Sequence, residues 1–168
     1  MNAPHRFSPD PRVQAAIEYG FRLKLDVPWE TNGQGQIIVN PPIGLKHAKR
    51  ADKLIAAIRI CLPDWRIWPE IGIHTADGVK APDLALVSAA FTEATDPHGF
   101  LIQAPEVCVE IMSPSNTWEE MRHKALLYLA AGAVETWVCD EHGRVHVFSG
   151  GGEIPSSSIA ASLPLDID

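Results

Sequence analysis

The feature that most constrains this chain is one apolar run near its middle. Residues 106–113 read EVCVEIMS, and after Glu106 at its start the only charge inside the run is Glu110. A nearly continuous apolar segment of this length is typical of a central strand that is covered on both faces. A carboxylate in such a strand is expensive to bury alone, so Glu110 needs a cation, a metal ion or a retained proton.

The segments around this run alternate between helical and strand patterns. Asp77-Gly78 has the signature of a hairpin turn, and Ser115, Asn116 or Thr117 is placed to cap a helix. Helices are predicted over 13–25, from Leu45 to Pro63 and over 118–131, and strands over 37–40, 65–75, 79–88, 134–140 and 145–148. This order predicts an α/β fold with a mixed sheet and few helices.

The chain length of 168 residues fits a single domain. The Pro-rich residues 1–12 are expected to form a flexible leader, and residues 13–148 the folded domain. Residues 149–168 are Gly/Ser-rich and are expected to form a C-terminal tail with room for one short strand. In that tail, only residues 159–167 have the apolar content of a strand.

The cysteine content and the net charge indicate which cellular compartment and which binding partners to expect. The three cysteines form no CxxC pair, which favours a reducing compartment, and no signal peptide or membrane-length apolar stretch is visible, so a cytoplasmic protein is expected. The net charge of −7 argues against a simple nucleic-acid binder, because such proteins neutralise phosphates. Either nucleic acid is not the partner, or acidic residues gather in a metal site while basic residues occupy one face.

Two acids are candidates for such a site. Asp83 lies in the predicted strand that returns from the hairpin, and Glu110 lies in the apolar strand that follows. Carboxylates that converge from adjacent strands repel each other, and a divalent cation such as Mg²⁺ removes that repulsion. Structural alternatives stay open: Asp83 as a strand-end residue, Glu110 in a buried salt bridge with Arg122 or Lys124, and Lys124 on a solvated helix face beside Glu120.

Several segments together resemble the Uma-two family of restriction endonucleases, which belongs to the PD-(D/E)xK nuclease superfamily. The resemblance is carried by APDLALVS, PEVCVEIMSPS, the helix with Lys124 and Tyr128, and AGAVETWVCD. It continues upstream through Trp29-Glu30, the segment IIVNPP and His47, and covers roughly residues 26–148.

The resemblance implies a restriction-endonuclease-like fold, in which helices flank a mixed sheet, and it implies roles for single residues. Asp83 matches the first acid of the motif and Glu110 the second. The superfamily lysine would fall at Met112, which is a departure from the pattern, and Lys124 on the following helix matches the family's substitute. Two further residues match by position: Glu30 as an additional acid, and His47 as a phosphate contact or, alternatively, a surface helix histidine.

The same resemblance implies an activity. It predicts an endonuclease that uses Mg²⁺ or Mn²⁺ at Asp83 and Glu110, acts on nucleic acid with DNA favoured over RNA, and forms a homodimer. Two alternatives remain: a catalytically inactive binding or scaffold module, and a small nucleotide hydrolase. A basic stripe built from Arg50, Lys53, Arg59 and Arg66 would favour a polymeric substrate over a nucleotide.

Overall fold

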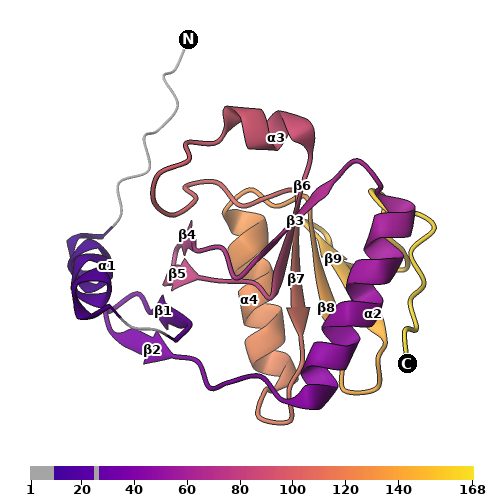
Figure 1. The fold of residues 1–168 in the computed structure, drawn as a ribbon, viewed down its shortest axis with the longest axis horizontal. Coiled ribbons are helices and arrows are strands. Elements are labelled where there is room, and N and C mark those ends of the chain that lie inside the picture. The colour runs from indigo at the N-terminus through magenta and orange to yellow at the C-terminus, as the bar shows by residue number, and fades with distance from the viewer. Residues whose placement is uncertain (1–9, 25–26) are drawn as a thin grey trace.

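A six-stranded mixed sheet forms the centre of the computed structural model, which describes residues 10–24 and 27–168 (Figure 1). Its strand order is β10-β9-β8-β7-β6-β3. The strands are β3 (Arg66–Pro69), β6 (Leu84–Val87), β7 (Val107–Ile111), β8 (Glu135–Cys139), β9 (Val145–Ser149) and β10 (Gly152–Ile154). In this sheet only β7 and β8 pair in parallel, and helix α4 (Trp118–Ala130) connects them; the other neighbours are antiparallel.

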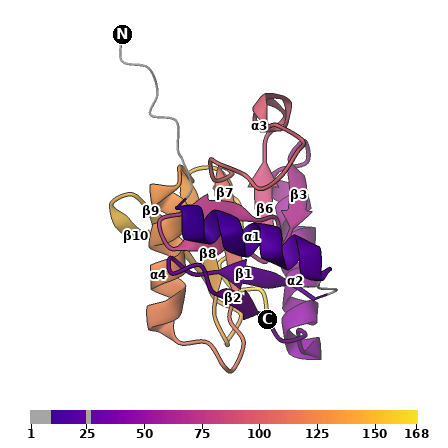
Figure 2. The same cartoon turned by 90° about the vertical axis from the view of Figure 1, so that its left-hand side faces the viewer.

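Helices flank this sheet, as expected for the predicted α/β class. They are α1 (Pro11–Leu23), α2 (Leu45–Cys61), α3 (Ala89–Ala94) and α4 (Trp118–Ala130). Two antiparallel ribbons lie beside α1: β1 (Trp29–Thr31) with β2 (Ile37–Val39), and β4 (Ile73–Thr75) with β5 (Gly78–Lys80). Figure 2 shows α1 outermost on this side of the molecule. None of the helices in the described residues is long and apolar enough to span a bilayer.

Strand β7 is buried along its whole length, which confirms that the apolar run is a central strand. Val109 packs in one core cluster with Leu54 of α2, whereas Cys108 packs in another with Tyr128 of α4. Because side chains alternate across a strand, Glu110 points to the same face as Cys108. The strand therefore directs its one carboxylate toward α4.

The long strands predicted on either side of the hairpin are interrupted in the structure. The expected strand 65–75 is divided into β3 and β4, because Glu70 takes a left-handed backbone conformation (φ 49°) directly after Pro69. The expected strand 79–88 is divided into β5 and β6 around Pro82, which has no N–H to donate to a sheet ladder. Helix α3 was not predicted.

Both ends of the chain differ from the sequence expectation. Residues 1–9 of the expected leader 1–12 lie outside the described part of the chain. Helix α1 begins within the expected leader, at Pro11. The Asp10 side chain caps this helix by accepting a hydrogen bond from the backbone N–H of Arg12 at 2.8 Å. The expected tail 149–168 packs onto the sheet: β10 pairs with β9, and Leu163 is buried in the core. Residues 159–167 contribute only an isolated bridge from Asp166 to Arg144.

Candidate active site

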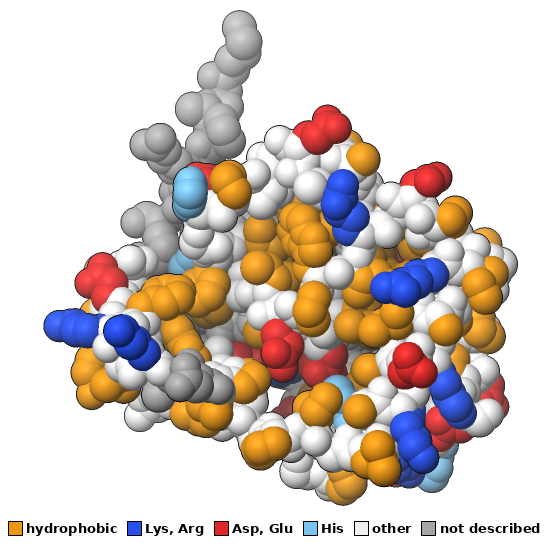
Figure 3. Space-filling model, in the orientation of Figure 1, with side chains coloured by type: hydrophobic (Ala, Val, Ile, Leu, Met, Phe, Trp, Pro, Cys, Tyr) orange, Lys and Arg blue, Asp and Glu red, His pale blue; other side chains and the backbone are white. Residues whose placement is uncertain are grey.

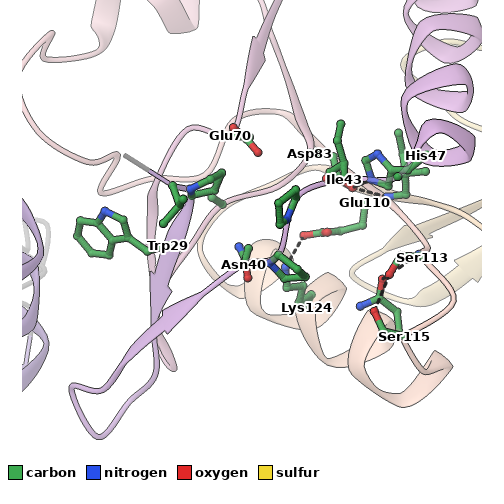
Figure 4. A pocket seen from close by; sticks show the side chains of 18 of the residues that line it. Trp29, Asn40, Ile43, His47, Glu70, Asp83, Glu110, Ser113, Ser115 and Lys124 are labelled. Carbon is green, nitrogen blue, oxygen red and sulfur yellow. Dashed lines mark hydrogen bonds and ion pairs between the residues drawn. The ribbon is translucent and has the colours of Figure 1, made fainter. Parts of the chain in front are cut away.

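A cavity of about 900 Å³ opens where the beginning of β6 and the end of β7 meet the first turns of α4. Residues 27–29 and 40–44 line its other side. In Figure 3, acidic side chains lie in this hollow between α1 and α2, while Lys and Arg side chains are spread around the face. Four of the five candidate residues predicted from the sequence line the cavity, namely His47, Asp83, Glu110 and Lys124 (Figure 4).

Asp83 and Glu110 lie on neighbouring strands at the same edge of the sheet. Leu84 pairs with Val109 in the antiparallel ladder, so continuing the register by one residue sets Asp83 opposite Glu110. Asp83 stands just before β6, and its Oδ2 accepts a hydrogen bond from the backbone N–H of Ile111 at 2.6 Å. The ladder between β6 and β7 thus brings the two acids together.

Glu110 is held from α4 by two side chains one helical turn apart. Its Oε1 lies 3.2 Å from Nζ of Lys124 and accepts a hydrogen bond from the hydroxyl of Tyr128 at 2.7 Å. Burial raises the pKa of Glu110 to about 7; the Lys124 ammonium opposes this rise, and the charges of Asp83 and Glu30 add to it. Near neutral pH, this carboxyl is therefore poised between its two protonation states.

Lys124 links α4 to the N-terminal ribbon. Its Nζ lies 3.0 Å from Oε1 of Glu30, a buried residue of β1 that also accepts from the backbone N–H of Ala81 at 3.1 Å. Burial alone would lower the pKa of Lys124, but the carboxylates of Glu110 and Glu30 outweigh burial and raise it. The alternative of a solvated Lys124 paired with Glu120 does not hold, because Lys124 faces the two buried acids.

His47 reaches the same cavity from α2. Its Nε2 lies 3.3 Å from Oδ2 of Asp83, and its side chain is only 10% exposed, so it lies in the cavity wall rather than on an open helix surface. The hydrogen bond to Asp83 raises the pKa of His47, although burial opposes this. Its buried Nδ1 finds no hydrogen-bond partner within the described part of the chain.

The structure defines the positions of further residues around the site, and of these only the role of Tyr128 was not anticipated. Tyr128 was noted only as a helix residue, although its spacing of four from Lys124 places both on one helix face. Thr117 is the cap of α4, forming a reciprocal capping box with Glu120, and Ser115 instead contacts the hydroxyl of Ser113 at 2.9 Å. Glu70 also lines the cavity, from a left-handed backbone conformation (φ 49°).

Met112, at the superfamily lysine position, is buried in a core cluster with Met121 of α4. Its side chain cannot replace an ammonium group at the acids. The cation beside Glu110 comes from α4 instead, through Lys124. Lys124 thus places an ammonium group beside Glu110, although Met112 stands where the lysine was expected.

The acids are suited to a divalent cation in one specific way. Asp83 and Glu110 are opposed, and the raised pKa of Glu110 reports the repulsion and burial that a cation would relieve. Mg²⁺ is commonly bound by one or two carboxylates together with substrate phosphates and water. Among the described residues, no group of three or more His, Cys, Asp or Glu side chains is arranged so that it could hold a metal ion.

The basic stripe considered from the sequence is not formed by its four residues. Arg50 is buried and paired with Asp168 at 2.6 Å, and Lys53 lies 3.7 Å from the same carboxylate. Arg59 and Arg66 are exposed. These four side chains therefore do not form a continuous basic surface beside the acidic cavity.

A mixed sheet between helices, with opposed acids and a lysine at one edge, defines a protein of the restriction-endonuclease-like class. The sequence model of the Uma2 family, described as "Putative restriction endonuclease", matches residues 18–164, and the chain belongs to this family.

A solved structure supports the fold. The crystal structure of a protein from Anabaena variabilis, titled a putative nuclease belonging to DUF820, is similar with a TM-score of 0.70 and 22% identity, over 90% of this chain and 94% of that one. The comparison with curated proteins gave no match.

Proposed function

We propose that this protein is a metal-dependent nuclease that hydrolyses phosphodiester bonds of nucleic acid, DNA in preference to RNA. The observation that carries the proposal is the opposition of Asp83 and Glu110 across the β6–β7 ladder, with the Lys124 ammonium 3.2 Å from Glu110. The preference for DNA follows from the family's description as restriction endonucleases.

Each side chain of the site has a distinct role in this proposal. Asp83 and Glu110 would hold Mg²⁺ or Mn²⁺, which when bound would polarise the phosphate and lower the pKa of water. Lys124 keeps its proton because its pKa is raised, so it neutralises developing negative charge rather than removing a proton. Glu30 and Tyr128 are positioning residues: Glu30 orients Lys124, and Tyr128 orients Glu110.

His47 is the second basic side chain that lines the cavity, beside Lys124. Its raised pKa favours the imidazolium form beside Asp83, and it lies where the cavity is open to a ligand. In its protonated form, His47 would attract a phosphate that approaches Asp83. We assign His47 to substrate phosphate contact.

Calorimetric titration of Mg²⁺ and Mn²⁺ tests the proposal. Wild type should bind at a specific site, and Asp83→Asn and Glu110→Gln should each lose that binding together with hydrolysis of labelled oligonucleotides. Glu119→Gln, on the exposed surface of the same α4, is the matched control. Absence of metal binding by folded wild type, even with oligonucleotide present, would rule out the mechanism and favour an inactive binding module.

A second candidate, hydrolysis of small nucleotides, is favoured by one observation. The cavity walls carry acids, and Arg50, Lys53, Arg59 and Arg66 do not form a basic stripe beside them, which suits a small ligand better than a polyanion. Comparing hydrolysis of mononucleotides and oligonucleotides under the same metal conditions separates the two substrates.

We also propose that the active protein is a cytoplasmic homodimer, as the family resemblance implies. The unpaired thiols of Cys61, Cys108 and Cys139 suit a reducing compartment. Exposed apolar side chains, among them Val39, Ile43 and Leu45, supply surface for self-association. Light scattering over a concentration series should give twice the mass of the chain; a constant monomer mass would contradict the dimer.

A further inference from the structure

Three aromatic rings gather at one end of the active-site cavity. Phe21 of α1, Trp29 of β1 and Phe100, from the loop after α3, all line it. The Phe21 and Phe100 rings are stacked, with centroids 5.5 Å apart and an interplanar angle of 25°. Trp29 meets both edge-on, at 5.7 Å from Phe21 and 5.9 Å from Phe100.

Two glycines make room for these rings. A Cβ on Gly20 would stand 2.8 Å from the Trp29 ring, and a Cβ on Gly72 would collide with the ring of Phe100. Any other residue at these positions would displace the aromatic side chain. The cluster is thus a built feature of the cavity wall rather than a chance contact.

Core packing accounts for two of the rings but not for the third. Trp29 and Phe100 pack against the small core of Val13 and Ile17 under α1. Phe21 is outside that core and is 59% exposed. An exposed ring that is stacked on a fixed neighbour at the edge of a cavity offers a flat apolar face to a ligand.

The rings and the carboxylates share one cavity. Figure 4 shows Trp29 at one end of the view and His47, Asp83 and Glu110 at the other, with Asn40 and Glu70 between them. The volume of about 900 Å³ lies in the range of pockets that enclose whole small molecules. A nucleotide can therefore place its phosphate at the acids while its base lies toward the rings.

The charge of the cavity indicates how such a ligand is held. Recognition of a duplex depends mainly on neutralising phosphates, and here Arg50 is turned away into its ion pair with Asp168. Stacking of a base on an aromatic ring needs no positive surface and tolerates any base. It does require that the base be unpaired, because a paired base has no free face to offer at a side wall.

We propose that Phe21, Trp29 and Phe100 form a stacking platform for an unpaired nucleobase next to the hydrolysed phosphodiester. The substrate class is accordingly single-stranded or locally unpaired nucleic acid. This inference rests on the proposed nuclease function and specifies the substrate of the same site.

Binding of phosphorothioate-linked, hydrolysis-resistant oligonucleotides that carry 2-aminopurine tests the platform, with the full chain and Mg²⁺ or Mn²⁺ present. Fluorescence anisotropy gives the affinity, and 2-aminopurine emission reports stacking directly. Phe21→Ala should weaken single-strand binding by about 5- to 150-fold, the range expected for loss of one stacked base. Phe21→Trp should retain it.

Tyr19→Ala is the matched control, because Tyr19 is 52% exposed on the same helix and does not line the cavity. It should leave affinity unchanged. Phe21→Leu, which keeps apolar volume without a ring, separates stacking from packing, and thermal unfolding and Mg²⁺ titration verify that each variant is folded and retains its metal site.

The outcomes are distinguishable. Tighter binding of the single strand than of the same sequence in a duplex, with loss of the 2-aminopurine signal in Phe21→Ala and in Phe21→Leu, supports the platform. Equal affinity for duplex, or full affinity in Phe21→Ala, overturns the platform while leaving the nuclease proposal intact. Failure of folded wild type to bind or hydrolyse any nucleic acid with metal overturns both.

Discussion

Replacing Glu110 by glutamine removes the most perturbed carboxyl of the site without changing its shape. Burial raises the pKa of Glu110 from 4.5 to about 7. Below pH 4.5 the folded and unfolded states both carry the proton. As the pH rises through about 7, the unfolded state releases its proton first, so the stability present at low pH is lost across this window.

The size of this loss follows from the shift. At about 1.4 kcal/mol per pH unit, the rise in pKa from 4.5 to about 7 corresponds to roughly 3 kcal/mol. Without metal, Glu110→Gln should therefore gain about 3 kcal/mol in free energy of unfolding relative to wild type between pH 4.5 and pH 8.5. Lys124 and Tyr128 can both still donate to the amide oxygen, so their contributions change little over this range.

Urea denaturation followed by tryptophan fluorescence, with chelator present, measures the difference at each pH. Mg²⁺ at about a thousandfold excess over Kd should reverse its sign at pH 8.5, because metal stabilises only the protein that binds it, by about 4.1 kcal/mol, which exceeds the advantage of about 3 kcal/mol held by Glu110→Gln. Parallel pH profiles for the two proteins would refute the argument that burial of Glu110 governs this titration. Glu119→Gln, exposed on α4, serves as the control and should follow wild type.

Three further substitutions probe the surroundings of the site. Tyr128→Phe removes the 2.7 Å hydrogen bond that lowers the pKa of Glu110, so the pH dependence of metal affinity, measured by titration, should shift to higher pH. The free energy of unfolding should fall by about 1.5–3 kcal/mol, and an unchanged pH profile would contradict this prediction. Arg50→Met should lower stability by about 1–3 kcal/mol in urea, yet leave the salt dependence of oligonucleotide binding unchanged, because Arg50 is committed to Asp168. Thr117→Ala breaks the capping box of α4 and should cost about 1 kcal/mol, whereas Thr117→Ser should not.

The central part of the site could be predicted because it depends on local pattern. The apolar run around Glu110 required a covered strand, and antiparallel pairing with the next strand fixed the position of Asp83. The fold class and the family were also confirmed. Periodicity of two and simple pairing are properties that a sequence displays directly.

The remaining contacts depend on distances that no sequence pattern encodes. The link from Lys124 to Glu30 joins residues 94 positions apart, and it is made by a ribbon whose placement depends on α1. Arg50 looked like a surface cation, but its ion pair with Asp168 spans 118 positions. The division of the strands at Glu70 reflects one backbone angle, which a helix or strand propensity does not predict.

The Lys124 ammonium has a consequence for how the protein matures. A domain whose fold depends on a bound metal ion, such as a zinc finger, cannot fold before the metal arrives. Here Glu110 and Glu30 already share an internal counter-ion within 3.2 Å. Under the proposed function, chain folding and metal loading would therefore be separable events, because the buried acids already have a counter-ion before a divalent cation binds.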